Sequence, residues 1–334
     1  MNYVDRQSQL QHWVEEQLKD GPLTLEAASS DASFRRYFRI RCGARTVIAM
    51  DAPPAHEDCR AFVRVAGLMA AAGLNVPEII AQDFERGFLL LSDLGTAGYL
   101  QALNAETADT LFADATDALV RWQMASKPGL LPPYDELLLR REVGLFPEWY
   151  LQRHLGLNLA DAQRSALDGV FAAVIQNNLA QPAVYVHRDF MPRNLMVCTS
   201  NPGVLDFQDA VCGPITYDVV SLFKDAFISW EEERVLDWTV RYWEKARRAG
   251  LPVDSDFGSF YRDFEWMGLQ RHLKVLGIFA RLHYRDGKRG YLDDTPRFIA
   301  YIRAVAVRYG ALAPLLALLD EIEGKAGASV GYTF

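Results

Sequence analysis

The chain has 334 residues, of which 50% are apolar and 23% are charged, a composition typical of a globular protein. Its 35 basic and 43 acidic residues give a net charge of −8, which argues against a general nucleic-acid binder. No run of 18 apolar residues is present to span a membrane, and residues 1–19 hold acidic residues without a signal-peptide core. We therefore expect a cytoplasmic protein with neither nucleic-acid nor membrane partners.

The four cysteines lie far apart and form no C-x-x-C pair. This spacing predicts neither a zinc site nor a disulfide framework. We interpret them as small core residues. They are Cys42, Cys59, Cys198 and Cys212.

The first hundred residues predict a small unit of mixed α and β structure. Apolar residues at helical spacing predict helices over about 5–19 and 56–72. Short apolar or alternating runs bounded by turns predict strands of an antiparallel sheet. These runs are 23–27, 34–40, 46–50, 76–81 and 87–91.

From about residue 100 the pattern changes to that of helices, with a pair of short strands in their midst. The expected helices are 107–124, 137–155, 160–178, 219–228, 231–249, 257–279 and 296–319. The fold class is therefore α+β. We expect an N-terminal nucleotide-binding lobe over residues 1–94 and a mostly helical lobe over 95–334, which carries the catalytic loop and the acceptor site.

Residues 186–209 concentrate the polar side chains that could do chemistry. The apolar run 183–186 leads into His187 and Asp189, in a loop that Pro192 interrupts. The turn 201–203 then reverses the chain, so the strand at 204–205 should return beside 195–197. This hairpin should place Asp206 next to Asn194.

Phosphoryl transfer from a nucleotide needs a carboxylate that orients the attacking hydroxyl, together with oxygen ligands for Mg²⁺. Asp189 fits the role of the carboxylate, and Asn194 and Asp206 fit the role of metal ligands. His187 is expected to buttress the loop through hydrogen bonds. These residues thus predict an enzyme that transfers a phosphoryl group from a nucleotide with the help of Mg²⁺.

The pattern H-x-D-x-x-x-x-N, with an aspartate 17 residues after Asp189, resembles the aminoglycoside phosphotransferase family of kinase-like small-molecule kinases. The resemblance implies a two-lobed protein-kinase-like fold. It also implies that Asp218, in the segment Tyr217-Asp218-Val219, braces the catalytic loop. A helix N-cap is a second reading of Asp218, and the two roles are compatible.

The resemblance extends to the nucleotide site. Ser92, Asp93 and Leu94 resemble the inter-lobe linker whose backbone pairs with adenine, although a strand end before a glycine turn explains the same residues. The turn 29–33, which includes Ser33, takes the place of the loop that covers the nucleotide, or is an ordinary hairpin.

One departure from the kinase pattern concerns the phosphate-binding lysine of the third strand. Met50 stands in its place, and no lysine occurs between Lys19 and Lys127. Arg36 follows the turn that would cover the phosphates, and its planar fork suits phosphate oxygens, so it is our first choice. An ordinary strand arginine is the competing interpretation.

Side chains that could contact an acceptor are aromatic, amide or charged residues of the second lobe. Aromatic rings stack on the apolar face of a sugar while polar groups hold its hydroxyls. Trp149 could equally be a core residue, and the basic segment 281–289 could equally be a solvated loop. The candidates are Gln208, Asp209, Trp149, Arg271 and Arg281.

Longer stretches, at 31–39, 50–54 and 270–281, are similar to the anomeric sugar kinases of bacterial cell-wall recycling. The similarity implies ATP-dependent phosphorylation of the anomeric hydroxyl of N-acetylmuramate and N-acetylglucosamine. It also implies that a downstream nucleotidyltransferase receives the product. An arginine in the region 271–289, for example Arg281, would then pair with the lactyl carboxylate of N-acetylmuramate.

Two further interpretations remain open from the sequence. The same catalytic residues could phosphorylate another small hydroxyl compound, such as an aminoglycoside, choline or homoserine. The missing lysine could instead mark a nucleotide-binding pseudokinase that regulates a partner. The presence of Asp189, Asn194 and Asp206 counts against a pseudokinase, because a protein without turnover has no chemical need for the base.

Overall fold

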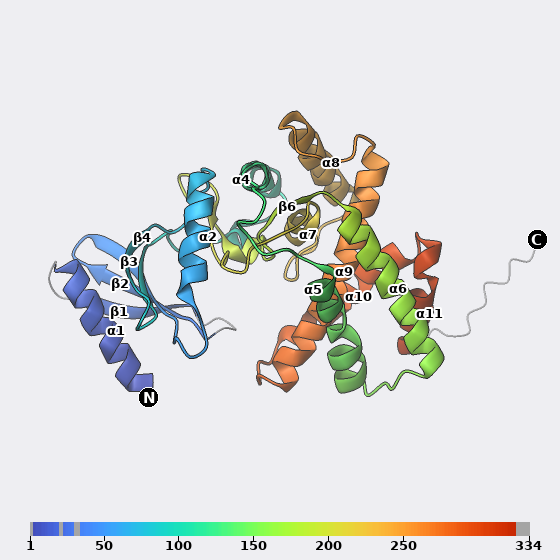
Figure 1. Cartoon of the computed structure of the whole chain (residues 1–334), viewed down its shortest axis with the longest axis horizontal. Coiled ribbons are helices and arrows are strands. Elements are labelled where there is room, and N and C mark those ends of the chain that lie inside the picture. The colour runs from blue at the N-terminus through green and yellow to red at the C-terminus, as the bar shows by residue number, and fades with distance from the viewer. Residues whose placement is uncertain (1–2, 20–22, 30–33, 325–334) are drawn as a thin grey trace, which may run out of the picture. The chain divides into compact units, whose positions relative to one another are not determined.

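The structure is a computed structural model that describes residues 3–19, 23–29 and 34–324 (Figure 1). The chain forms two units, which are described separately below. Unit 1 comprises Met1–Trp122 and Pro192–Ala210, and unit 2 comprises Gln123–Met191 and Val211–Phe334. The lobe boundary expected at residue 94 stays a prediction.

Unit 1 is built on a five-stranded sheet with the strand order β1-β2-β3-β5-β4. Every pair of neighbouring strands is antiparallel, as predicted. Alternating residues of β2, such as Phe38 and Ile40, are buried on one face of the sheet. The strands are β1 (Leu23–Ser29), β2 (Arg36–Cys42), β3 (Arg45–Asp51), β4 (Ile79–Asp83) and β5 (Phe88–Ser92).

Helices cover this sheet. The amphipathic helix α1 (Tyr3–Leu18) buries Leu10 and Trp13 against β2, β3 and β5. The helix α2 (Cys59–Ala71) starts at an N-cap, Asp58, whose carboxylate accepts a hydrogen bond from the backbone of Arg60. Figure 1 shows α1 and α2 on opposite sides of the strands. The helices α3 (Tyr99–Ala102) and α4 (Ala108–Met124) follow.

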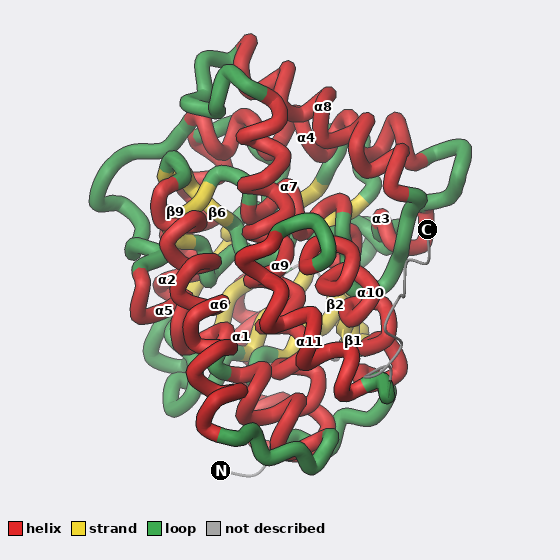
Figure 2. The backbone as a smooth tube through the Cα atoms, turned by 90° about the vertical axis from the view of Figure 1, so that its right-hand side faces the viewer, coloured by secondary structure: helices red, strands yellow, loops and turns green. Residues whose placement is uncertain are grey.

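Unit 2 is arranged around the long helix α9 (Phe257–Tyr284), which is buried along most of its length. Figure 2 shows α9 between α6 and α10. The strand β6 (Ala183–Val186) pairs with β9 (Val211–Pro214). The other elements are α5 (Glu136–Val143), η1 (Phe146–His154), α6 (Asp161–Ala180), α7 (Tyr217–Phe223), α8 (Glu232–Arg248), η3 (Tyr291–Asp294), α10 (Thr295–Ala306), η4 (Gly310–Leu312) and α11 (Ala313–Ile322).

Two predicted helices are broken in the structure. The segment 137–155 divides into α5 and the π-helix η1, because Pro147 cannot continue the hydrogen bonds of α5. At this break α9 comes so close that a Cβ on Gly277 would lie 2.4 Å from the carbonyl carbon of Leu145. The segment 296–319 divides at Gly310 into α10 and α11, and a proline opens α11.

The bounds of two further helices also differ from the prediction. The helix expected at 219–228 is the shorter α7, which begins at Tyr217 and ends at Phe223. The helix expected at 257–279 continues to Tyr284. Among the described residues, none of the helices combines the length and the apolar character that crossing a membrane requires.

Candidate active site

The catalytic loop of unit 2 leaves the buried strand β6 at His187, whose side chain is fully buried. The backbone N–H groups of His187 and Arg188 donate to the two carboxylate oxygens of Asp218, at 2.7 and 3.0 Å. The expected brace is therefore confirmed. The N-cap reading of Asp218 is wrong, because the N-cap of α7 is Thr216 and the Asp218 carboxylate is bound to the loop instead.

The backbone of this loop is held in a conformation that orients Asp189. Arg188 has a φ of +78°, a region that side-chain-bearing residues seldom occupy and that clusters at functional sites. The N–H of Asp189 donates to Nδ1 of His187 at 3.2 Å, and the N–H of Met191 donates to the carbonyl of Asp189 at 2.9 Å. These contacts support the expected buttressing role of His187.

A buried network lies behind Arg188. The carboxylate of Glu142, on α5, contacts the guanidinium of Arg188 at 2.6 Å and the ammonium of Lys274 at 3.2 Å. The hydroxyl of Tyr134 donates to the same carboxylate, and Lys274 also donates to the hydroxyl of Tyr217 at 2.9 Å. One carboxylate thus ties the catalytic loop to α5, α7 and α9.

Burial and charge shift the titration of these carboxyl groups in opposite directions. Burial raises the pKa of Asp218 to about 7, although the two N–H groups of the loop work against it. Burial also acts to raise the pKa of Glu142, but the charges of Lys274 and Arg188 outweigh it and hold that pKa below its ordinary value. Glu142 is therefore an anion near neutral pH.

In unit 1 a second loop carries the expected metal ligands. The strands β7 (Leu195–Met196) and β8 (Gly203–Val204) form the predicted hairpin, and the N–H of Leu205 donates to the carbonyl of Asn194 at 2.9 Å. The side-chain amide of Asn194 lies 3.4 Å from Oδ2 of Asp206. The predicted neighbourhood of these two residues is confirmed.

The structure around Asp206 positions its carboxylate. Asp206 has a φ of +61°, and its Oδ1 accepts a hydrogen bond from Nε2 of Gln208 at 2.9 Å. The next residue, Phe207, is fully buried, and its ring lies 4.7 Å from that of Phe62 on α2. An apolar contact of the following residue thus anchors the strained position of Asp206.

The oxygens of Asn194 and Asp206 suit Mg²⁺, which favours oxygen ligands and is usually held by one or two carboxylates together with substrate phosphates. Within the described residues no group of three or more His, Cys, Asp or Glu side chains could hold a metal by itself. The two residues therefore fit a magnesium ion that arrives with a nucleotide better than a metal caged by protein groups alone.

The residues expected to bind the nucleotide are engaged within unit 1. Nε of Arg36 donates to the buried carboxylate of Asp51 at 3.0 Å, and Nε of Arg6 donates to the other oxygen of that carboxylate at 3.1 Å. The carboxylate of Asp93 binds the guanidinium of Arg39, at 2.7 and 3.0 Å. Ser33 lies outside the described residues.

The backbone of the expected adenine linker also makes bonds within unit 1. The N–H of Ser92 donates to the carbonyl of Glu78 at 2.9 Å, and the carbonyl of Leu94 accepts a hydrogen bond from Sγ of Cys198 at 3.3 Å. A nucleotide would therefore use other backbone groups of this segment, and adenine binding here stays a prediction.

The structure separates the two arginines predicted to contact an acceptor. Arg271 and Arg281 are ten residues apart on α9, which is about 15 Å along a helix axis. Arg271 is buried, and its Nη2 lies 3.7 Å from Sδ of Met191. Burial and the charge of Arg285 lower the pKa of Arg281, at the far end of the helix. The two arginines cannot hold one small group together.

The other predicted acceptor residues lie on different elements. Gln208 and Asp209 follow Asp206 in unit 1, where Nε2 of Gln208 lies 3.3 Å from the Asp209 carboxylate. Trp149 is half-buried on η1 in unit 2. Their assignment to the acceptor site stays a prediction.

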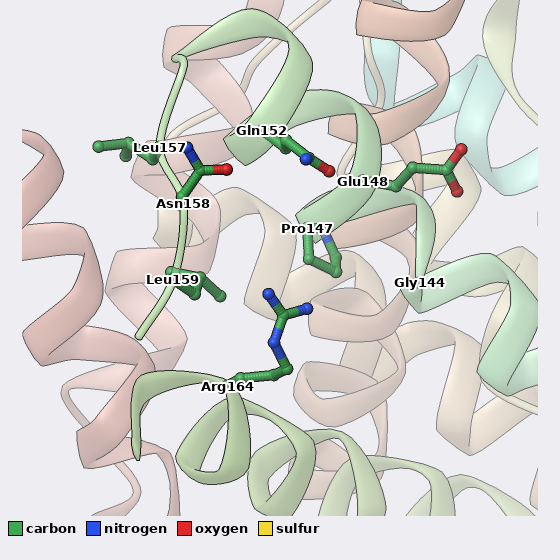
Figure 3. Close-up of a pocket in the computed structure, with 8 residues that line it drawn as sticks. All are labelled: Gly144, Pro147, Glu148, Gln152, Leu157, Asn158, Leu159 and Arg164. Carbon is green, nitrogen blue, oxygen red and sulfur yellow. The ribbon is translucent and has the colours of Figure 1, made fainter. Parts of the chain in front are cut away.

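A surface pocket of about 240 Å³ lies beside η1 (Figure 3). Figure 3 shows the Arg164 guanidinium reaching from α6 toward Pro147. Glu148, which precedes the acceptor candidate Trp149 in the sequence and is itself a candidate, lines this pocket. Its lining residues are Gly144, Pro147, Glu148, Gln152, Leu157, Asn158, Leu159 and Arg164.

Solved structures of small-molecule kinases share this fold. The choline kinase LicA of Streptococcus pneumoniae has a TM-score of 0.64 at 11% identity, with 90% of this chain and 99% of that one covered. The aminoglycoside phosphotransferase APH(2'')-IIa, solved with streptomycin and ATP, has a TM-score of 0.60 at 14% identity, with coverages of 93% and 98%. The predicted protein-kinase-like fold is thereby confirmed.

The sequence comparisons define the family. The phosphotransferase enzyme family model matches residues 24–253, and the chain belongs to this family. The N-acetylmuramate/N-acetylglucosamine kinase of Pseudomonas putida is 54% identical, with 97% of this chain and 98% of that protein covered. The enzyme of the same name from Neisseria meningitidis is 48% identical, with coverages of 99% and 100%.

Several residues of the site were not found from the sequence. Glu142 has the pattern of an ordinary polar residue in a helix, and nothing near it indicates an ion pair with Arg188, 46 positions away. Lys274 belongs to the stretch 270–281 that carries the resemblance, but the resemblance assigned it no role. No sequence pattern around Asp51 indicated that its carboxylate binds two arginines.

Proposed function

We propose that this chain transfers the γ-phosphoryl group of ATP to the anomeric hydroxyl of N-acetylmuramate and N-acetylglucosamine. The observation that carries the proposal is an identity of 48% to 54%, over 97% or more of the chain, to kinases named for these two sugars. A third enzyme of that name, from Pseudomonas aeruginosa, is 54% identical over 92% of the chain. A nucleotide donor is supported by the family and by solved complexes of the same fold with ATP and GDP.

Asp189 orients the anomeric hydroxyl and accepts its proton. An anomeric hydroxyl is more acidic than an ordinary alcohol, so a carboxylate of modest basicity suffices. The contacts that support this role are the hydrogen bonds from the Asp189 N–H to His187 and from the loop to Asp218. They hold the loop before the substrate arrives, which lowers the cost of positioning.

Asn194 and Asp206 are the proposed ligands of Mg²⁺, which when bound neutralises charge on the phosphates. Gln208 donates to the Asp206 carboxylate and so orients it. Arg36 is the proposed cation for the phosphates, and the segment 92–94 is proposed to meet the adenine. Asp209, Trp149 and Arg281 remain candidates for the acceptor side.

The product would be a sugar 1-phosphate. A nucleotidyltransferase joins such a sugar 1-phosphate to the nucleotidyl group of a nucleoside triphosphate and releases pyrophosphate. We therefore propose a nucleotidyltransferase as the next enzyme. A cytoplasmic location stays a prediction.

The test is ADP release from ATP and Mg²⁺ with five acceptors: N-acetylmuramate, N-acetylglucosamine, choline, homoserine and kanamycin. Phosphorus NMR of the product then identifies the phosphorylated atom. We expect turnover with the two sugars and a resonance split by the anomeric proton. Turnover with another acceptor alone, or a phosphate on a different sugar oxygen, would contradict the proposal.

The alternatives raised by the sequence are not favoured. Similarity to choline and aminoglycoside kinases, at 11% to 14% identity, reflects the shared fold. The missing third-strand lysine is the one feature that suggests a pseudokinase, and the presence of Asp189, Asn194 and Asp206, the residues proposed for turnover, counts against it.

A further inference from the structure

The side chain of Arg271 is an anomaly on the buried face of α9. It is only 3% exposed, and its Nε and Nη1 have no hydrogen-bond partner among the described residues. Nη2 reaches only the thioether of Met191, a weak acceptor, at 3.7 Å. A buried guanidinium without an oxygen partner is costly, so its retention calls for a ligand or another compensation.

Asp225 is a second buried group with a missing partner. It is 1% exposed and follows the end of α7, the helix that Figure 1 shows beside α9. Its Oδ2 accepts a hydrogen bond from the N–H of Phe227 at 3.0 Å, whereas its Oδ1 has no partner among the described residues. Burial raises the pKa of Asp225, while the nearby charge of Arg271 lowers it.

Arg271 lies beside the catalytic loop. Met191, which contacts Arg271, stands two residues after Asp189 and donates its N–H to the Asp189 carbonyl at 2.9 Å. The charge of Arg271 also acts on Asp218, which braces the same loop. The unsatisfied donors of Arg271 therefore lie beside the loop that carries Asp189, and Asp225 lies within range of the charge of Arg271.

We propose that Arg271 and Asp225 bind a hydroxyl of the amino sugar that N-acetylmuramate and N-acetylglucosamine share. The hydroxyl oxygen accepts a hydrogen bond from the guanidinium, and the hydroxyl proton is donated to Oδ1 of Asp225. This assignment rests on the proposed function and names the residues that recognise its acceptor. The ligand oxygen takes the place of the Met191 thioether, whose flexible side chain can move aside.

A neutral hydroxyl fits this pair better than the lactyl carboxylate of N-acetylmuramate. N-acetylglucosamine has no such carboxylate, so the guanidinium would stay without an oxygen partner when this sugar binds. The buried carboxyl groups of Asp218 and Asp225 would also oppose a third negative charge nearby. A hydroxyl, by contrast, donates and accepts at once and satisfies both residues.

The experiment compares Arg271→Lys and Asp225→Asn with the wild type, using both sugars and ATP as varied substrates. We expect the KM of each sugar to rise by at least about tenfold in both variants, because a buried polar group loses its partner. The KM of ATP should change little. Arg303→Lys is the matched control, because Arg303 also has an Nε without a partner but binds Asp320 and Glu323 through its other nitrogens.

Deoxy analogues of N-acetylglucosamine give a second measurement that does not depend on the folding of a variant. One analogue should have a raised KM with the wild type, and this penalty should vanish in Arg271→Lys, since the partner of the missing hydroxyl is already lost. If every deoxy analogue is accepted as well as the parent sugar, the inference is wrong.

Two other outcomes would also overturn it. A rise in KM confined to N-acetylmuramate would assign Arg271 to the lactyl carboxylate. An unchanged KM with a lowered melting temperature would make Arg271 and Asp225 purely structural. Failure of the wild type to phosphorylate either sugar is a different result, since it contradicts the proposed function before any variant is tested.

Discussion

At the scale of single residues, Asp189 is distinguished by how its backbone is held. Its N–H is bonded to His187, and the preceding residue is fixed to Asp218 in a strained conformation. These contacts hold the backbone that carries the Asp189 carboxylate. This is what an orienting base requires, since positioning supplies much of the rate in phosphoryl transfer.

Asp189→Asn should lower kcat by about 10²- to 10⁴-fold, because the amide cannot accept the hydroxyl proton. The KM values for ATP and sugar should change much less, since the amide retains the shape of the side chain. Steady-state kinetics measures both. Asp237→Asn on α8 is the control, because that carboxylate is exposed and pairs with Arg241. Undiminished turnover in Asp189→Asn would remove its assignment.

Arg36 and Arg6 share one buried carboxylate, that of Asp51, and so offer a matched pair. Replacing either arginine with alanine should lower the free energy of unfolding, because Asp51 then loses part of its counter-charge. Arg36→Ala alone should also raise the KM for ATP, since only Arg36 follows the turn expected to cover the phosphates. Thermal unfolding and ATP kinetics separate the two effects. Equal ATP KM values for the two variants would make Arg36 structural.

At the scale of elements, the catalytic loop depends on helices that are distant in the sequence. Glu142 of α5 holds Arg188 of the loop and Lys274 of α9, and Tyr217 of α7 receives a hydrogen bond from Lys274. Glu142 and Lys274 are buried and the Arg188 side chain is only 19% exposed, so the two cations gain little contact with water when the carboxylate is lost. The network therefore couples the packing of three helices to the geometry of the loop.

Glu142→Gln should lower the free energy of unfolding by about 3–5 kcal/mol, because the buried Lys274 and the largely buried Arg188 lose their counter-charge. It should also lower kcat at a temperature well below unfolding while leaving both KM values near those of the wild type, since Glu142 acts on the loop and not on the substrates. Glu136→Gln on the same helix is the control, because its pair with Arg140 is exposed and contributes about 0.5 kcal/mol or less. Equal effects of the two substitutions would contradict the positioning role.

At the scale of the whole molecule, the titration of Asp218, which braces the catalytic loop, affects the free energy of unfolding. Folding raises its pKa from the ordinary 3.8 to about 7, chiefly through burial, so the folded protein binds more protons than the unfolded chain between these values. The stability that this group contributes is full below pH 3.8 and is lost as the pH rises through about 7.

The free energy of unfolding of the wild type should therefore fall relative to Asp218→Asn as the pH rises from 4 to 7, by at most about 1.4 kcal/mol per pH unit. Denaturant unfolding at several pH values measures it. His272, whose pKa burial holds well below its ordinary value, titrates in the same way in both proteins and cancels in the difference. Parallel stability curves would show that Asp218 does not titrate as described.

Local sequence patterns correctly predicted the strands, helices and hairpin whose contacts join residues close together in the chain. The alternating run 34–40 and the tight turns between short runs predicted the antiparallel sheet, and the helical spacing of Leu10 and Trp13 predicted α1. The neighbourhood of Asn194 and Asp206 could be predicted because a hairpin of a dozen residues carries both. The breaks at Pro147 and Gly310 were missed, because the apolar periodicity continues across each break.

The sequence by itself determined the kinase-like class, through the spacing of His187, Asp189, Asn194 and Asp206 along one short stretch. Only the tertiary structure decided which distant groups hold that stretch in place and which buried groups lack a partner, as with Glu142 and Arg271. The physical reason is that spacing along a strand or helix sets neighbours a few residues apart. The partner of a buried charge is chosen by packing between elements that no local pattern encodes.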